Sequence, residues 1–294
     1  MATYPFRLLN VFTVRGTPLS GNPLCVFESA GALSGEAMQA LALQFNLSET
    51  TFILPSQRAD ARVRIFTPTY EMPFAGHPTL GTAYVCRALG LAGDTLTLEM
   101  QAGLIGVTAR GDHWTLTANA PTWHPPRIPR PRIAAMLGLD AADVGERPLW
   151  VDTGSRQLVV PLVSEAAVRR AQPQPGPWSE LDGPAGQGMA LAFASREASG
   201  PARPGASPAA TPILSRFFFQ QHGGAILEDP ATGSAAANLG GWQLATGRAL
   251  PARFEISQGE YVGRPSILDL EIDAGRRIAV GGDVVELGRG TLDL

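Results

Sequence analysis

Short stretches in which apolar and polar residues alternate recur along the chain, and this pattern is typical of β-strands with one buried face. The clearest example is residues 61–66, where two arginines alternate with valine and isoleucine. Alternation, or a short run of β-branched and aromatic residues, predicts strands over residues 6–14, 24–27, 50–54, 61–66, 95–100, 104–109, 114–118, 149–152, 157–162, 189–194, 213–220, 254–257, 266–272, 277–280 and 284–286.

Helical spacing of apolar residues is confined to a few segments. Ser34 is predicted to cap a helix that runs to about Gln44. Two longer helices with few polar residues are predicted to end at Gly90 and Gly247. Shorter helices are predicted over residues 133–137 and 165–171. Strands therefore outnumber helices in the prediction.

Both longer helices are preceded by the motif E-x-P-x-x-G, which opens at Glu71 in the first copy and at Glu228 in the second. In each copy the proline and the glycine interrupt an extended segment, and no further breaker follows until the terminal glycine, which is typical of a strand, a tight turn and a helix. The copies align without a gap, so the sequence predicts two related halves. The alternative is a chance match in a chain rich in glycine and alanine.

Each of these turns is predicted to deliver the N-terminus of a helix. The first turn of a helix leaves about four backbone N–H groups unpaired and carries roughly half a positive charge, so it binds carboxylates without arginine or lysine. Two such helix starts are expected to hold one anion between the halves. The alternative is that they are ordinary helix starts in a large α/β protein.

The order of the predicted elements indicates an α+β protein. Strands follow one another more often than they alternate with helices, which excludes a doubly wound parallel sheet. We predict two similar domains, each with a curved, mainly antiparallel sheet wrapped around a central apolar helix. The proline-rich residues 121–131 place the junction there. The domains then cover residues 1–120 and 121–294. The alternative is that the last strand of the chain returns to the first half. Residues 195–212 are predicted to form a mobile surface loop without chemical importance.

The composition narrows the class of partner. The chain has 294 residues, 17% of them charged, and a formal net charge of −3 without a basic run, which argues against nucleic-acid binding. No segment reaches the roughly 18 apolar residues of a membrane span, and the first residues lack an apolar signal segment. We expect a soluble, cytoplasmic protein that binds a small molecule and no membrane. Cys25 and Cys86 are predicted to be reduced core residues.

Few polar residues lie beside the two turns, and these are the candidates for chemistry. His77 is expected near the first helix start, where a neutral imidazole donates one hydrogen bond and accepts another, unless it is a structural histidine. Asp229 lies in the second turn, where it takes part in chemistry or only caps the helix. Ser234 takes the place of His77 in the second copy. Glu49 has no equivalent there; it is either a surface residue or a buried carboxyl with a raised pKa suited to proton transfer.

The sequence does not support other kinds of site. Glu71 and Glu228 occupy equal places in both copies, so we predict that both have a structural role in fixing the turn. The histidines share no metal-ligand spacing and the cysteines are far from them in sequence, so no metal site is predicted. The sequence has no phosphate loop, no G-x-G-x-x-G after a strand and no G-x-S-x-G elbow. We therefore expect chemistry without a cofactor.

Five motifs follow one another over nearly the whole chain. They are Gly-Asn-Pro at residues 21–23, Asn-Leu-Ser-Glu-Thr-Thr-Phe at 46–52, Arg-Ile-Phe-Thr-Pro at 64–68 leading into Pro-Phe-Ala-Gly-His-Pro at 73–78, Glu-Asp-Pro-Ala-Thr-Gly-Ser-Ala at 228–235, and Gln-Gly at 258–259 with Gly-Arg-Pro-Ser at 263–266. Together they resemble the PhzF-like family of phenazine-biosynthesis proteins.

The resemblance implies the diaminopimelate-epimerase fold, an active site between the two halves and usually a homodimer. It implies an isomerase that moves a proton on a small carboxylate, and the best-known substrate of the family is trans-2,3-dihydro-3-hydroxyanthranilate. By the same resemblance Glu49, His77 and Asp229 are the catalytic residues, and Glu49 is the acid and base that moves the proton.

The resemblance also implies that Ser48, Gly76, Gly233 and Ser234 bind the substrate, the glycines through backbone N–H groups. Related epimerases use a pair of thiols in their turn segments, but both turns lack cysteine here, so thiol-based racemisation is not expected. Two alternatives remain open. One is an epimerase or racemase of another amino or hydroxy acid, and the other is a metabolite-binding protein of the same fold without turnover.

Overall fold

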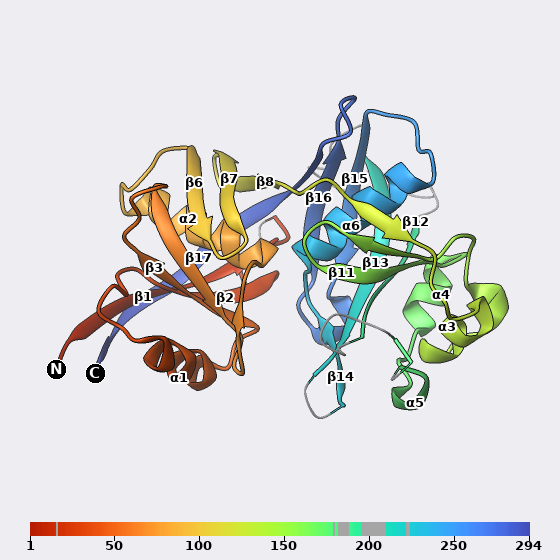
Figure 1. The fold of residues 1–294 in the computed structure, drawn as a ribbon, viewed down its shortest axis with the longest axis horizontal. Helices are drawn as coiled ribbons and strands as arrows, with labels where there is room; N and C mark the ends of the chain where they lie inside the picture. Colours follow the sequence, from red (N-terminus) through yellow and green to blue (C-terminus); the bar gives the residue numbers. More distant parts are fainter. Residues whose placement is uncertain (16, 179, 182–187, 196–209, 222–223) are drawn as a thin grey trace. The chain divides into compact units, whose positions relative to one another are not determined.

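The computed structural model describes residues 1–294 apart from residues 16, 179, 182–187, 196–209 and 222–223. The chain divides into two compact units, one of Met1–Thr117 with Gly281–Leu294 and one of Ala118–Val280 (Figure 1). The loop predicted over residues 195–212 lies outside the described residues except for its ends. None of the helices within these described ranges is long and apolar enough to cross a membrane.

In the first unit a mainly antiparallel sheet closes around one helix. Its strands are β1 (Thr3–Val11), β2 (Asn22–Phe27), β3 (Glu49–Leu54), β4 (Ala61–Phe66), β5 (Glu71–Met72), β6 (Thr95–Met100), β7 (Gly103–Arg110), β8 (His113–Thr117) and the larger part of β17 (Ile278–Asp293). Pairing runs from β1 through β2, β3, β4, β6, β7 and β8 to β17, which pairs again with β1. Helix α2 (Gly76–Ala88) contacts β1, β2, β3, β4, β6 and β8, so the sheet surrounds it.

Alternation along the strands separates an inner face of this sheet from an outer face. On β3, Thr51 contacts α2 through its hydroxyl, so Glu49, two residues earlier, lies on the same inner face. Thr50 and Phe52 lie on the outer face, which helix α1 (Gly35–Phe45) covers. The apolar cluster beneath α1 consists of Cys25, Phe27, Ala30, Met38, Leu41, Ala42, Phe52 and Phe66.

The second unit repeats this arrangement. Its strands are β9 (Thr122–His124), β10 (Leu149–Asp152), β11 (Arg156–Pro161), β12 (Met189–Ser195), β13 (Thr211–Gln220), β14 (Ile226–Asp229), β15 (Ala252–Gln258), β16 (Ser266–Ile272) and the start of β17. The pairs β11–β12 and β13–β15 are parallel, as β2–β3 and β4–β6 are in the first unit. Helix α6 (Gly233–Ala245) has 13 residues, as α2 has, and lies among strands of its own unit (Figure 1). The predicted α+β fold with two similar domains is confirmed.

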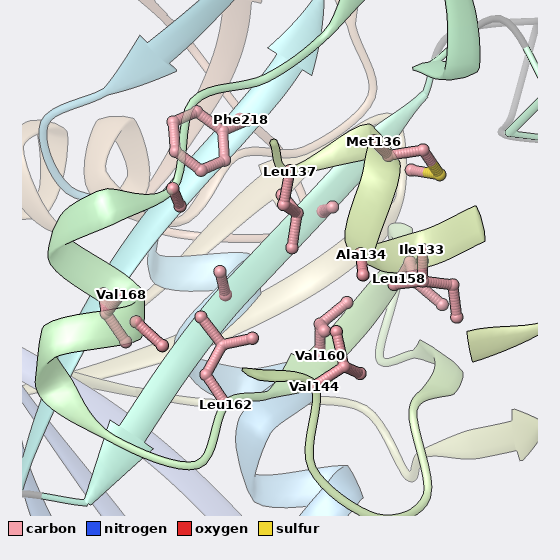
Figure 2. Close-up of a cluster of buried hydrophobic side chains, with 14 of the residues drawn as sticks. Ile133, Ala134, Met136, Leu137, Val144, Leu158, Val160, Leu162, Val168 and Phe218 are labelled. Atoms are coloured by element: carbon pink, nitrogen blue, oxygen red, sulfur yellow. The ribbon is translucent and has the colours of Figure 1, made fainter. Parts of the chain in front are cut away.

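Short helices cover the outer face of the second unit. They are α3 (Arg130–Met136), α4 (Glu165–Arg170) and α5 (Pro175–Trp178), and the described residues also form 3-10 turns at Ala141–Asp143 and Glu260–Val262. Ile133 of α3 and Val168 of α4 share one buried apolar cluster with Val160 and Phe218 of the strands (Figure 2). Because α1 covers the equivalent strands of the first unit, the repeat includes this second layer.

Two predictions that relied on glycine and proline residues differ from the structure. The separate strands predicted over residues 277–280 and 284–286 form the single strand β17. Gly281 lies at a close contact instead of a turn, because a Cβ there would lie 2.8 Å from the carbonyl oxygen of Trp114. The proline-rich residues 121–131 contain β9, which pairs with β10, and the start of α3, where proline is tolerated in the first helical turn.

Candidate active site

Glu49 is the first residue of β3, and the end of α1 fixes its place. Helix α1 begins after Ser34, whose hydroxyl accepts a hydrogen bond from the amide of Ala37, as predicted. It ends at Asn46, which takes the left-handed conformation with a φ of 51°. The chain then enters β3, where Glu49 pairs with Leu24 of β2. Its side chain is 15% exposed, so the carboxyl is largely shielded from water.

His77 lies beside Glu49 at the start of α2. The helix begins after Ala75, and in the described structure no N-cap side chain bonds its first turn. His77 is the second helical residue, it is buried, and its Nε2 lies 3.3 Å from Oε2 of Glu49. Burial lowers the pKa of His77 to about 3, and a hydrogen bond with the backbone of Pro23 opposes this effect only in part. The imidazole is therefore neutral at physiological pH.

The hydrogen bond to Pro23 sets the tautomer of His77. A backbone carbonyl only accepts, so the ring nitrogen that meets Pro23 carries the proton. Because Nε2 faces Glu49, we assign this proton to Nδ1, which leaves a lone pair on Nε2. Among the described residues Nε2 has no hydrogen-bond partner. One proton placed between Nε2 and the carboxyl oxygen of Glu49 would give Nε2 a partner, so this pair suits proton transfer.

A buried hydrogen bond between two threonines sets the distance between β3 and α2. The hydroxyl of Thr82 donates to the carbonyl oxygen of Pro78 over 2.7 Å, so it accepts the bond of 2.8 Å from the hydroxyl of Thr51. Both threonines are fully buried. Thr51 follows Glu49 on the inner face of β3, and Thr82 lies on the helix that carries His77. This bond therefore holds the carboxyl and the imidazole in register.

Strand registers show that the carboxyl of Glu49 has no counterpart in the second unit. Met189, the first residue of β12, occupies the place of Glu49. In both units the next residue along the strand pairs with a phenylalanine, and this phenylalanine pairs in turn with the glutamate that opens the E-x-P-x-x-G motif. The two units therefore share a backbone frame but differ in chemistry. The first unit holds the carboxyl–imidazole pair, and the second has a thioether at the place of the carboxyl.

Glu71 and Glu228 fix equivalent turns, as predicted from their equal places in the repeat. Arg64 of β4 donates two hydrogen bonds of 2.7 and 2.6 Å to Glu71. Arg216 of β13 binds Glu228 in the same way, with 2.6 Å between Nη2 and Oε2. Each guanidinium also lies over a phenylalanine ring, at 4.9 and 4.8 Å from the ring centre. These pairs tie β5 and β14 to the sheet just before α2 and α6 begin.

Asp229 ends β14 and lies in a hydrogen-bonded turn. The side-chain amide of Gln258 donates to the backbone oxygen of Asp229 over 2.8 Å and to the hydroxyl of Thr232 over 3.1 Å. The hydroxyl of Thr232 donates to the carboxylate of Asp229. Gly259 has a φ of 81°, and a Cβ there would lie 2.5 Å from the carbonyl oxygen of Pro230. The Gln-Gly motif thus packs directly against the turn that carries Asp229.

Ser234 is the second residue of α6, at the place that His77 takes in α2. Its Oγ accepts a hydrogen bond of 2.8 Å from the side-chain amide of Gln157. Gly76 and Gly233 are the first residues of the two helices, and both are buried. As described here, the N-cap residue of α6 also makes no side-chain cap. The first-turn amides of both helices thus lack a cap from that residue.

The structure places the predicted site residues in two groups. The first unit carries Ser48, Glu49, Gly76 and His77, and the second carries Asp229, Gly233 and Ser234. Glu49 and His77 are in direct contact, and Ser48 is half-buried just ahead of β3. The expectation that both groups bind one substrate stays a prediction.

Sequence reasoning missed the residues that hold these side chains in place. They are Thr51, Thr82, Gln157, Asn238 and Gln258. Asn238 carried a signal, because a polar amide within an otherwise apolar helix needs buried partners. Gln258 belongs to one of the five motifs, where its hydrogen bonds give it a role. Thr51 also belongs to one of these motifs, but its residue type gave no hint of its hydrogen bond, because threonine is common in strands.

The two cysteines are free and buried, as predicted. Burial raises the pKa of the Cys86 thiol to about 12, with a smaller effect from the charge of Asp60, and it raises the pKa of Cys25 further. Both thiols are therefore protonated at neutral pH. Neither is a nucleophile or base under these conditions, since the thiolate is the reactive form.

The lowered pKa of His77 makes stability depend on pH. The unfolded chain takes up a proton on this residue below about pH 6.5, while the folded chain resists it down to about pH 3. The free energy of unfolding should therefore fall with decreasing pH in this window, by up to about 1.4 kcal/mol per pH unit from this group. When urea unfolding is measured at several pH values, the free energy of unfolding of His77→Gln should change less with pH than that of the wild type. His124→Gln, at an exposed position, is the control that should keep the pH dependence of the wild type; an equal pH dependence in His77→Gln would contradict the prediction.

Comparison with known proteins gives a consistent result. The chain matches the family of phenazine biosynthesis-like proteins, PhzC-PhzF, over residues 9–290. It is 38% identical over 275 residues to trans-2,3-dihydro-3-hydroxyanthranilate isomerase of Pseudomonas aeruginosa, with 89% of each protein covered. It is 35% identical to an uncharacterised isomerase of Pasteurella multocida, with 99% of this chain and 95% of that protein covered. The structure of the PhzF-family phenazine biosynthesis protein of Bacillus anthracis has the same fold, with a TM-score of 0.83, 23% identity and full coverage of both chains.

The duplicated fold and the relatives define an isomerase of the diaminopimelate-epimerase-like class. The sequence resemblance is thereby confirmed over nearly the full length. The chain belongs to the PhzC-PhzF family of phenazine biosynthesis-like proteins.

Proposed function

We propose that this isomerase moves a proton between two carbon atoms of a small carboxylate, and that trans-2,3-dihydro-3-hydroxyanthranilate is its substrate. The observation that carries the proposal is the 3.3 Å contact between the shielded carboxyl of Glu49 and the neutral imidazole of His77. The relative from Pseudomonas aeruginosa, 38% identical to this chain, is named for isomerisation of that compound. The substrate carries a carboxylate, which suits the uncapped helix starts.

In the proposed reaction Glu49 serves as base and then as acid. Its carboxylate takes the proton from C3 of the substrate and the same group returns it at C1, so the double bonds shift and no atom is gained or lost. His77 supports the intermediate step, because Nε2 accepts a hydrogen bond from the protonated carboxyl while Nδ1 stays bonded to Pro23. A positioned acid–base group of this kind contributes about 10²–10⁴ in rate.

We assign the remaining site residues by their place in the repeat. Ser48, Gly76, Gly233 and Ser234 are proposed to bind the substrate, the two glycines through amides at helix starts. Asp229 is proposed as a third catalytic residue, and the hydrogen bond from Thr232 keeps its carboxylate in one orientation. The expected homodimer stays a prediction.

The function is tested by incubating the full chain with trans-2,3-dihydro-3-hydroxyanthranilate and following the proton NMR spectrum. The C3 proton signal should disappear while a signal for hydrogen on C1 appears, at a rate proportional to enzyme concentration. An unchanged spectrum at stoichiometric enzyme would contradict the proposal. If calorimetry then showed binding of 3-hydroxyanthranilate, the chain would be a binding protein, and deuterium uptake at the α-carbon of an amino acid would identify an epimerase.

Thr51→Val tests the bond that sets the distance between β3 and α2. Valine has nearly the same shape but cannot donate to Thr82, so we expect kcat to fall about tenfold with little change in KM. The free energy of unfolding should fall by about 1 kcal/mol. Steady-state kinetics and urea unfolding measure the two effects.

Thr50→Val is the matched control. The hydroxyl of Thr50 is buried on the opposite face of β3 and has no hydrogen-bond partner within the described residues. Its removal should leave kcat unchanged and leave stability equal or slightly higher. An equal loss of kcat in both variants would contradict the positioning role of Thr51.

A further inference from the structure

A chain of buried side chains leads to Ser234 from inside the second unit. The hydroxyl of Thr153 donates to Oδ1 of Asn238 over 2.8 Å. Nδ2 of Asn238 donates to the carbonyl oxygen of Ser155 and to Oε1 of Gln157, each over 2.8 Å. Nε2 of Gln157 donates to Oγ of Ser234, again over 2.8 Å. Thr153, Asn238 and Gln157 are each at least 95% buried, so water does not compete for these bonds.

The donor and the acceptor of every hydrogen bond in this series are determined. The carbonyl oxygen of Ser155 only accepts, so the nitrogen of the Asn238 amide must face it, and the oxygen of that amide must face Thr153. The second proton on the same nitrogen goes to Gln157, whose oxygen must therefore face Asn238. The amide nitrogen of Gln157 is left to donate to Ser234. The hydroxyl of Ser234 thus accepts on this side and keeps its own proton for another partner.

Comparison with the first unit shows that this series of hydrogen bonds does not belong to the backbone frame that the two units share. By strand register and by the repeat motif, the places of Gln157 and Asn238 are taken in the first unit by Leu24 and Gly81. Those two residues are in tight apolar contact, because a Cβ on Gly81 would lie 2.5 Å from a methyl group of Leu24. The same pair of positions thus packs strand against helix in one unit and sets the polarity of a hydroxyl in the other.

We propose that Gln157, held by Asn238, is a positioning residue that makes the Ser234 hydroxyl a hydrogen-bond donor toward the substrate. This inference rests on the proposed function, in which Ser234 binds substrate, and it specifies the class of group bound there. That group is an acceptor such as a carboxylate or carbonyl oxygen, and a group that only donates, such as an ammonium, is disfavoured. A ligand group that only donates leaves the proton of the Ser234 hydroxyl without an acceptor, and this weakens its binding relative to an acceptor.

The experiment reverses this polarity with Gln157→Glu. The introduced carboxylate still accepts from Asn238, but it has no proton to donate, so the Ser234 proton turns toward it and the outward side of the hydroxyl becomes an acceptor. Calorimetry on the full chain compares 3-hydroxyanthranilate with the analogue in which an aminomethyl group replaces the carboxylate, because its ammonium only donates. The wild type should prefer the carboxylate, and Q157E should lower the ratio of the two affinities by about tenfold or more.

Ser234→Ala separates the effect of polarity from plain charge repulsion. Repulsion between the new carboxylate and the ligand would persist in the S234A/Q157E double variant, whereas the effect of a reversed hydroxyl would vanish. An affinity ratio in Q157E equal to that of the wild type, the same change in the S234A background, or no preference in the wild type would each overturn the inference. Q157M, which is neutral and of similar size, serves if Q157E does not fold; it should lose part of the preference, and full retention would overturn the inference.

This test is independent of turnover. If the carboxylate preference shifts as expected but Glu49→Gln retains full isomerase activity, then the assignment of Glu49 fails and the inference about Gln157 stands. If Glu49 proves essential while Q157E keeps the wild-type preference, only the inference fails. Kinetics of Q157E give a second readout. A change in substrate recognition alone should raise KM more than it lowers kcat.

Discussion

Replacement of Glu49 by glutamine is expected to lower kcat for proton transfer by about 10²–10⁴-fold, with KM changed much less. Glutamine keeps the size of the side chain, but its amide neither takes up a proton from carbon nor returns one. The equivalent place in the second unit is taken by Met189, whose thioether does not exchange protons. His77 cannot take over as the base, because its pKa of about 3 makes it a poor proton acceptor at neutral pH. Proton NMR of the substrate measures the rate directly.

Glu36→Gln is the control for this variant, because Glu36 is an exposed carboxylate in the first turn of α1 and should be dispensable. A substrate deuterated at C3 adds a second readout. If one carboxyl performs both transfers, part of the deuterium should reappear at C1 in ordinary water, whereas two separate groups would replace all of it by solvent hydrogen. Undiminished turnover in Glu49→Gln would remove this residue from the mechanism.

The fold was predictable because the residues that mark its turns act locally. The proline and glycine after Glu71 and Glu228 mark a strand, a turn and a helix within about ten residues, and both helices begin where the motif places them. Strand alternation also depends on neighbouring residues only. The continuity of β17 was not predictable in this way. The close contact of Gly281 is with Trp114 of β8, which is remote in sequence, so an isolated pair of glycines reads as a turn.

The candidate site was predictable only in part, and for a similar reason. Glu49 lies in a short connection after α1, where spacing alone favours a surface carboxylate, and its significance came from the family resemblance. Its contact with His77 depends on closure of the sheet around α2, which brings the start of β3 to the start of the helix. Gln157 gave no signal at all, because a polar residue at a strand end is ordinary. Its importance follows from its burial and from the fixed direction of its two bonds.

The duplicated frame separates structural from chemical positions. Residues that both units need are kept in both, as with Glu71 and Glu228, which fix the turns before the helices. Residues that differ at equivalent places are the candidates for chemistry, as with His77 and Ser234. In the proposed function Glu49 of the first unit moves the proton, and Ser234 of the second unit binds an oxygen atom that accepts its hydrogen bond. A comparison of repeats within one chain thus gives functional information without an alignment of relatives.

Replacement of Glu228 by glutamine is expected to have the largest effect on stability. The carboxylate and its partner Arg216 are only 8% and 10% exposed, so removing the negative charge leaves a buried guanidinium without a counter-ion. Breaking a buried ion pair in this way costs about 3–5 kcal/mol. The backbone oxygen of Ala171, 2.6 Å from Nη1, and the ring of Tyr261 offset part of the loss, so we expect about 3 kcal/mol.

Glu71→Gln is the matched variant in the first unit, where the same pair with Arg64 is 22% and 24% exposed. Water solvates the unpaired guanidinium better there, so the loss should be about 1 kcal/mol. Urea unfolding must be followed with a probe in each unit, because two units need not unfold in one transition. If both variants lose equal stability, burial does not determine the strength of these pairs. The turn before α6 depends on Glu228 as well, so Glu228→Gln should also weaken substrate binding through Asp229 and Ser234, and kinetics of the folded fraction would detect this as a raised KM.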